Sequence, residues 1–460
     1  MRAVAALFLS LLPAFAQSRA GAAKRIITPD LSKGPVYLAG FDHNRVATRV
    51  HDDLYARCIA LAADRVLVVC GVDSIGLFIE DVQKIRDSAA ERMEQPVDIV
   101  VAALHDHEAP DTMGLWGPAP DKSGIDEEYN LFVIDRTAEA AAEAVHSLRP
   151  ATWKAASVKN AELDGFINDD RPPRVTDAEL VILSAVDRKG RTIATLVNWA
   201  NHPETLGSHN TEVTADYPGY FYSQLEKRTG GVAVLVNGAI GGMQSPLGAE
   251  IRDPVTRKPA PEESFRKAEL LGRRVADLAA DACRSAKPQS LEHVEYREAE
   301  LELPVENRLF RAAAAAGLFE HRKAITEDGD MRTRIGMFRL SSRSGLLVEA
   351  AVVPGELYPE LSWGGVERYH GADFPEAPIE PPLKKLMTAP FRMLIGLGND
   401  EIGYIIPKAE WDEKPPYLQD ASKAWYGEVN SVGPETAPTI LAGFQSLFQG
   451  EPPETGQKKP

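Results

Sequence analysis

Short apolar runs alternate with amphipathic segments along most of the chain. Six apolar runs, at about 65–71, 97–104, 193–199, 232–236, 346–353 and 393–397, predict buried strands. Hydrophobic residues recur with helical spacing at about 79–93, 127–148, 262–286 and 308–325. Strands and helices that alternate in this way predict an α/β fold with a mixed β-sheet core flanked by helices. No repeat or linker divides the pattern, so we expect one large catalytic domain over residues 25–449.

The two ends of the chain differ from this pattern. Residues 1–16 combine Arg2, an apolar stretch and the small-residue site Ala14-Phe15-Ala16, which together are typical of a cleavable secretory signal peptide. The alternative, a buried N-terminal helix, would need a helical periodicity that this stretch lacks. Residues 450–460 are rich in Pro, Gly and Lys and predict a disordered tail. We therefore expect a secreted or periplasmic protein without a transmembrane segment.

Polar clusters follow five of the predicted strands. They are His105-Asp106-His107, Asn201-His202-Pro203-Glu204, the glycine-rich segment from Asn237 to Gly242, Pro354-Gly355-Glu356 and Gly398-Asn399-Asp400. In α/β proteins, sites form outside the carboxyl ends of the strands. Five clusters in equivalent positions predict one shared active site.

The histidines and the glutamate of these clusters are candidate metal ligands. His105 and His107 are two residues apart, so both side chains point to the same side of an extended chain. With His202 and Glu356, His105 completes a set of two histidines and a carboxylate, which suits catalytic Zn²⁺ with one open position. Taken singly, each histidine could be a hydrogen-bonded structural residue and Glu356 a surface turn residue. The chain has neither H-E-x-x-H nor G-x-S-x-G, so zincins and α/β-hydrolases are not supported.

Charge and cysteine content restrict the function further. A formal net charge of -16 argues against binding to nucleic acid and against electrostatic attachment to anionic lipid. The chain has three cysteines. Cys58 and Cys70 lie inside apolar runs, which predicts buried small hydrophobic residues, although an exported protein could join two cysteines in a disulfide.

The order of these motifs resembles the N-terminal catalytic domain of the neutral/alkaline non-lysosomal ceramidase family. The matching landmarks, in order over about residues 37–430, are Asp52 to Arg57, Gly71 to Ser74, His105-x-His107, Asn201-His202-Pro203, Asn237 to Pro246, Val353 to Glu356 and Gly403-Tyr404. The resemblance implies a zinc amidohydrolase that cleaves the N-acyl bond of ceramide into a fatty acid and a sphingoid base. It also implies a lipid amide as the substrate, and it leaves the oligomeric state unknown.

The resemblance also assigns roles to individual residues. The zinc ligands that it implies are His105, His202, Glu356 and Tyr404. His107 lies beside the zinc as a general acid/base or hydrogen-bonding group, or alternatively orients His105.

Three further residues receive catalytic roles from the same resemblance. Arg171 resembles an arginine that contacts the polar head of the substrate, the alternative being a solvated loop arginine. Tyr426 resembles a tyrosine near the site and could instead only pack there. Ser245 stands where the family has its active-site serine, but this chain reads Gly242-Met243-Gln244-Ser245-Pro246 and lacks the family's acidic residue. We therefore expect zinc-activated water to be the nucleophile and Ser245 to have a supporting role.

The substrate is the least determined part of this interpretation. Leu115 and Trp116 lie in a segment that differs from the family's glycine-rich loop. They could line an apolar entrance, or Trp116 could be an ordinary buried residue. Two other functions stay open: a zinc hydrolase of another amide or of an ester on the same scaffold, and a non-catalytic exported binding protein.

Overall fold

The computed structural model describes residues 18–315, 329–418 and 426–450. The predicted signal peptide, residues 451–460 of the predicted tail and residues 316–325 of the fourth predicted helix lie outside these ranges. The strands are β1 (Arg19–Ile26), β2 (Arg49–Val50), β3 (Tyr55–Ala62), β4 (Val66–Val72), β5 (Asp98–Ala103), β6 (Arg149–Val158), β7 (Leu180–Asp187), β8 (Thr192–Trp199), β9 (Glu212–Val213), β10 (Val232–Asn237), β11 (Leu291–Pro304), β12 (Asp330–Ser342), β13 (Gly345–Val352), β14 (Glu356–Leu357), β15 (Phe391–Ile395) and β16 (Tyr404–Ile405). The helices are α1 (Ile79–Glu91), α2 (Glu127–His146), α3 (Ala161–Asp164), α4 (Asp216–Thr229), α5 (Phe265–Ser285), α6 (Arg308–Ala315), α7 (Pro359–Trp363), α8 (Leu383–Leu386), α9 (Tyr426–Val429), α10 (Thr436–Gln449) and the 3₁₀ helix η1 (Lys408–Glu410).

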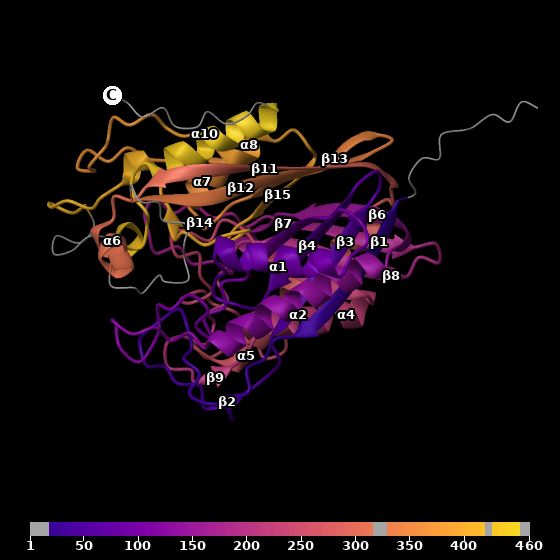
Figure 1. Cartoon of the computed structure of the whole chain (residues 1–460), viewed down its shortest axis with the longest axis horizontal. Coiled ribbons are helices and arrows are strands. Elements are labelled where there is room, and N and C mark those ends of the chain that lie inside the picture. Colours follow the sequence, from indigo (N-terminus) through magenta and orange to yellow (C-terminus); the bar gives the residue numbers. More distant parts are fainter. Residues whose placement is uncertain (1–17, 316–328, 419–425, 451–460) are drawn as a thin grey trace, which may run out of the picture.

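Two mixed sheets pack face to face and form the centre of the molecule. The larger sheet has the strand order β10-β8-β7-β6-β1-β3-β4-β5, and the smaller has the order β11-β12-β13-β15. Their facing side chains share one core, to which the larger sheet contributes Val69 and Leu196 and the smaller Phe338 and Val348. Figure 1 shows α10 outside the smaller sheet and α1, α2, α4 and α5 outside the larger one. The predicted α/β class, with a mixed sheet core flanked by helices, is confirmed.

The six predicted strands and the first three predicted helices are present in the structure, and the fourth predicted helix is present over residues 308–315. The strand predictions correspond to β4, β5, β8, β10, β13 and β15, and the helix predictions to α1, α2, α5 and the described part of α6. The longest strand, β11, was missed because charged residues alternate with apolar ones along it. That alternation reflects a strand with one buried face.

The helices begin where local chemistry favours them. The Asp126 carboxylate caps α2 by accepting the N–H of Tyr129, and the Ser264 hydroxyl caps α5 by accepting the N–H of Lys267. In α1, Val82, Ile85 and Ala89 recur on the buried face. These helices cover the outer face of the larger sheet with apolar side chains and leave its strand ends open.

The larger sheet curls so strongly that its two edge regions meet. β10 and β5 are the outermost strands in the order, yet β10 packs against β3, β4 and β5. A Cβ atom at Gly71 of β4 would lie 2.1 Å from the carbonyl oxygen of Leu235 in β10, so this approach requires glycine. The curl therefore brings the carboxyl end of β5 next to the carboxyl ends of β8 and β10.

The structure confirms that Cys58 and Cys70 are buried and decides the pairing that the sequence left open. Cys58 and Cys70 are fully buried, but they form a disulfide and are not two separate thiols. They are directly opposite each other in the antiparallel pair β3–β4, where side chains approach closely. Cys283 is free and buried.

In the part of the chain that the structure describes, no helix combines the length and the apolar character needed to cross a membrane.

Candidate metal centre and active-site cavity

The candidate site lies where the ends of β5, β8 and β13 converge. The side chain of Asn237, at the end of β10, donates to the carbonyl oxygens of Leu104 at 2.9 Å and of Asn201 at 3.0 Å. These carbonyls immediately precede His105 and His202. One buried amide therefore fixes the relative positions of two candidate ligands that are far apart in sequence.

His105 reaches the site through a turn. Its φ is +63°, in the left-handed region, so the chain is not extended there as the sequence argument assumed. The rings of His105 and His107 still converge, with centroids 4.8 Å apart. Asp106 lies between them, and its Oδ1 accepts the N–H of Glu108 at 3.0 Å. The predicted convergence is confirmed, but it depends on this turn and not on the alternation of a strand.

Two histidines present their Nε2 atoms to one carboxylate. Nδ1 of His105 lies 2.8 Å from the carbonyl oxygen of Ile75, and Nδ1 of His202 lies 2.8 Å from that of Gln244. Because a carbonyl only accepts, each Nδ1 carries a proton, and Nε2 is the nitrogen that offers a lone pair when the ring is neutral. Glu356 faces both, with Oε1 3.5 Å from Nε2 of His105 and Oε2 3.1 Å from Nε2 of His202.

Burial and neighbouring charge set the protonation of this group. Burial lowers the pKa of His105 and outweighs the nearby Glu356. Burial also acts to lower the pKa of His202, but the carboxylates of Glu204 and Glu356 outweigh it and raise that pKa to about 9. Burial acts to raise the pKa of Glu356, whereas His105 and a hydrogen bond to His202 bring it below its ordinary value.

A two-stranded sheet places Tyr404 next to Glu356. β14 and β16 are parallel, and Glu356 is paired directly with Tyr404. The hydroxyl of Tyr404 lies close enough to the Glu356 carboxylate to act to lower its pKa. It also lies 3.5 Å from the Met243 sulfur. Its role as a ligand stays a prediction, supported by this position.

His107 completes a group of three buried imidazoles. One ring nitrogen each from His105, His107 and His202 lie within 4.8 Å of one another, a grouping that could hold a metal ion. Burial, reinforced by the other two imidazoles, lowers the pKa of His107 well below its ordinary value. A Cβ atom at Gly40 would lie 2.3 Å from the ring, so glycine is needed there. His107 is thus either a third histidine ligand or a neutral base beside the donor set.

A cavity of about 710 Å³ opens onto these residues. Its wall includes Phe41, Phe78, Leu115, Trp116 and Phe310, together with His105, His107, His202, Glu204, Glu356 and Tyr404. Leu115 and Trp116 therefore line the entrance, as one of the two sequence interpretations expected. Tyr426 is also in the wall, 53% exposed at the rim, with its ring 5.9 Å from that of Tyr404.

Arg171 does not occupy the predicted position. Among the described residues, the cavity wall does not include it. Its guanidinium is 5% exposed and binds both oxygens of Glu428 at 2.7 Å. It also lies over the ring of Tyr358, 5.1 Å from the centroid, and that ring packs against Tyr404. The positive charge of Arg171 is already paired with Glu428, so it is not free to meet a substrate. The geometry instead favours a role in which Arg171 holds Tyr358, and Tyr358 in turn packs against Tyr404.

Ser245 is buried behind the histidines. Its Oγ accepts the N–H of Leu247 at 3.0 Å, and its hydroxyl lies close enough to Glu204 to act to lower the pKa of that carboxyl group. The described cavity wall does not include Ser245. This location suits the supporting role that the sequence suggested.

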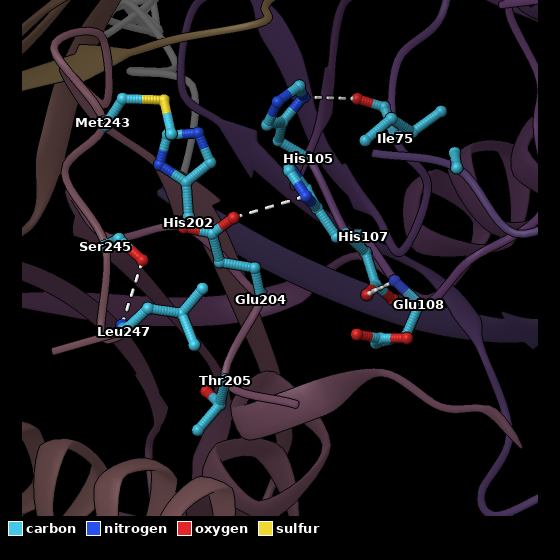
Figure 2. A network of polar contacts seen from close by, with 12 residues as sticks. Ile75, His105, His107, Glu108, His202, Glu204, Thr205, Met243, Ser245 and Leu247 are labelled. Atoms are coloured by element: carbon cyan, nitrogen blue, oxygen red, sulfur yellow. Dashed lines mark hydrogen bonds and ion pairs between the residues drawn. The ribbon is translucent and has the colours of Figure 1, made fainter. Parts of the chain in front are cut away.

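Glu204 is the residue of this site to which the sequence assigned no role. It belonged to the cluster after β8, but a carboxylate five residues beyond the end of a strand is usually on the surface. In the structure Glu204 is 2% exposed and lies 3.3 Å from Nδ1 of His107. Figure 2 shows its carboxylate reaching toward His107 from the His202 loop.

Known proteins are similar to this chain at the level of structure. No family model and no curated protein matches the sequence. The solved structure of neutral ceramidase from Pseudomonas aeruginosa matches with a TM-score of 0.71 at 17% identity, covering 97% of this chain and 76% of that chain. A ceramidase complexed with C2 matches with a TM-score of 0.71 at 15% identity, covering 97% of this chain and 77% of that chain. The chain therefore has the fold of the neutral ceramidases, as the order of its motifs indicated.

Proposed function

We propose that this protein is a zinc-dependent hydrolase that cleaves the N-acyl bond of a ceramide-like lipid into a fatty acid and a sphingoid base. The observation that carries the proposal is the convergence of His105, His202 and Glu356, with His107 beside them, on an apolar cavity. The fold supports it, since both structural neighbours are named as ceramidases.

The donor set fits zinc. Two imidazole nitrogens and one carboxylate oxygen are ligands of catalytic Zn²⁺ sites, which keep a further position open. The carbonyls of Ile75 and Gln244 hold the Nδ1 protons, which orients both rings and raises the basicity of Nε2. Tyr404 is placed to join this set through its contact with Glu356. When bound, zinc would polarise a carbonyl group and make water a nucleophile near neutral pH.

His107 would manage the protons of the reaction. It lies in the cavity wall beside the donor set, and its lowered pKa keeps the ring neutral and able to accept a proton near pH 7. An amide needs both removal of a proton from water and delivery of a proton to the departing nitrogen. One imidazole next to the cavity can do both in turn.

The cavity walls suit a long alkyl chain. Phe41, Phe78, Met113, Trp116 and Phe310 supply aromatic and flexible apolar surface. Each methylene moved from water into such surface contributes about 0.8 kcal/mol. An acyl chain therefore gains affinity with length until the cavity is filled.

Hydrolysis of a defined substrate panel tests the proposal. The purified protein is assayed on ceramides of several acyl lengths, short N-acyl amides and aryl esters, with chelator and with zinc restored. We expect chelator-sensitive release of fatty acid from ceramide, and loss of both bound zinc and activity in His202→Ala. His209→Ala is the matched control, because the His209 side chain is 88% exposed and its ion-pair partner among the described residues is Glu263.

Other results would favour the two alternatives. Zinc-dependent turnover of esters or of short amides alone would keep the metal chemistry and reject the lipid substrate. Absence of both bound zinc and turnover would favour a non-catalytic binding protein.

We further propose that the protein is exported and cleaved before Gln17. Residues 1–16 have the composition of a signal peptide. The Cys58–Cys70 disulfide supports an oxidising compartment. N-terminal sequencing of the protein recovered outside the cytoplasm should begin at Gln17, and an intact Met1 would reject this part of the proposal.

A further inference from the structure

A buried carboxylate lies beside the candidate base. Glu204 is 2% exposed and forms part of the cavity wall. Burying a carboxylate is costly unless hydrogen bonds or charges compensate it. Here His107, His202 and the hydroxyl of Ser245 compensate it only in part, because burial still raises the pKa of Glu204. A carboxylate in this position costs stability, so its contact with His107 is the feature that calls for a functional explanation.

The main chain holds Glu204 and His107 together. The N–H of His107 donates to the carbonyl oxygen of Pro203 at 3.0 Å, and the N–H of Glu204 donates to that of His202 at 3.0 Å. The turn that carries His107 is thus bonded to the loop that carries Glu204. The 3.3 Å separation of Glu204 Oε2 from His107 Nδ1 follows from this link.

Glu204 and Glu356 face different imidazole nitrogens. Glu356 lies on the Nε2 side of His105 and His202, where a metal would be held. Glu204 lies on the Nδ1 side of His107. Among the residues that the structure describes, neither ring nitrogen of His107 has a hydrogen bond of good geometry. Its Nδ1 has the Glu204 carboxylate as neighbour, and its Nε2 is buried without a hydrogen bond among the described residues.

We propose that Glu204 is the positioning residue of His107, holding the proton on Nδ1 so that the unprotonated Nε2 serves the reaction. The catalytic part of this inference rests on the proposed function. As the water oxygen bonds to the amide carbon, one water proton passes to Nε2 of His107. The same proton passes to the amide nitrogen as the C–N bond breaks, and the amine departs. The Nδ1 proton stays between the ring and Glu204, whose negative charge stabilises the imidazolium formed between these steps.

The tautomer of His107 provides a test that does not depend on activity. Histidine is labelled with nitrogen-15 in the zinc-loaded protein, and the His107 signals are identified by their loss in His107→Gln. We expect the Nδ1–H form in the wild type. Glu204→Gln keeps an oxygen that can accept this proton and should retain the tautomer, whereas Glu204→Ala should shift it toward Nε2–H. An unchanged His107 spectrum in Glu204→Ala overturns the proposal.

Kinetics and metal content complete the experiment. Glu204→Gln should lower kcat by about 10²-fold, the contribution typical of general acid–base catalysis, and leave KM and bound zinc near the wild-type values. Glu204→Ala should lower kcat further. Loss of zinc from both variants would make Glu204 a metal ligand and overturn the positioning role.

The matched control is Glu263→Gln. Glu263 also lies 3.3 Å from a histidine Nδ1, that of His209, but both side chains are exposed. This variant should change neither kcat nor the His107 signals. If the wild-type protein hydrolyses no amide, the proposed function is refuted. The nitrogen-15 spectrum of His107 would still show whether Glu204 holds the proton on Nδ1.

Discussion

Replacing Arg171 by alanine tests whether this residue contacts the substrate, as the sequence suggested, or stabilises the fold through a buried ion pair. The structure pairs its guanidinium with both oxygens of Glu428 at 2.7 Å and with the carbonyl oxygen of Glu410 at 2.9 Å. The side chains of Arg171 and Glu428 are 5% and 0% exposed. Removal of Arg171 therefore leaves a carboxylate that is buried and has lost its charge partner.

The expected loss of stability is large. Removing one partner of a buried ion pair costs about 3–5 kcal/mol. With an unfolding entropy of about 2.1 cal/mol/K per residue over 460 residues, 1 kcal/mol corresponds to about 1 °C, so Tm should fall by about 3–5 °C. Because the ring of Tyr358 separates Arg171 from Tyr404, kcat/KM well below Tm should fall by less than about tenfold, the lower end of the loss for groups bonded directly to a metal ligand.

Thermal unfolding and steady-state kinetics on one set of variants decide the question. Glu428→Gln should lower Tm as Arg171→Ala does, and the double variant Arg171→Met with Glu428→Met should recover part of the loss because no charge is left unpaired. Arg174→Ala is the control, since this exposed neighbour makes one hydrogen bond, to the carbonyl oxygen of Ile167. An arginine that stabilises the transition state directly would instead cost about 10²–10³-fold in kcat with little change in Tm. That result would refute the structural role.

Three further predictions concern the loop, the buried acid and the disulfide. Asp111 accepts five backbone N–H groups of residues 113–124 at 2.7–3.3 Å. Asp111→Asn removes one acceptor oxygen, so KM for long-chain substrates should rise several-fold with a smaller change in kcat. An unchanged KM across a chain-length series would show that this loop does not shape the entrance. Burial raises the pKa of Asp73 to about 7 against the opposing charge of Arg57. The folded state thus keeps a proton that the unfolded chain loses above about pH 4, so the free energy of unfolding should fall as pH rises from about 4 to about 7, a fall that Asp73→Asn should flatten in urea titrations. The disulfide closes a separation of 12 residues. Replacing Cys58 and Cys70 by alanine should lower the free energy of unfolding by about 2–3 kcal/mol, and equal urea midpoints for the two proteins would contradict this.

The order of the apolar and polar positions was enough to predict the secondary structure near the site. β5, β8 and β13 are nearly continuous apolar runs because both of their faces are buried, and such runs can be recognised without a partner. The polar residues that follow them could be predicted as a site because strand ends are where an α/β fold leaves room for a ligand. This reasoning found His105, His202 and Glu356, and the structure brings all three together.

Tertiary structure decided what each neighbour of those residues does. The sequence cannot show that the larger sheet curls until β5 meets β10, because curl depends on the packing of two sheets and on close approaches such as that at Gly71. Nor can it show that Arg171 is paired with Glu428, 257 positions further along the chain. Glu204 illustrates the same limit: its place beside His107 is set by a backbone hydrogen bond between two loops.

The sequence by itself therefore determined six of the strands, four of the helices, the strand ends at which the polar site residues lie and the candidate metal ligands His105, His202 and Glu356. These follow from local periodicity and residue type, which act over a few neighbours along the chain. The structure alone decided the disulfide, the left-handed turn at His105, the pairing of Arg171 and the position of Glu204. Each of these depends on contacts between residues distant in sequence, whose geometry is fixed only when the two sheets and their loops have packed.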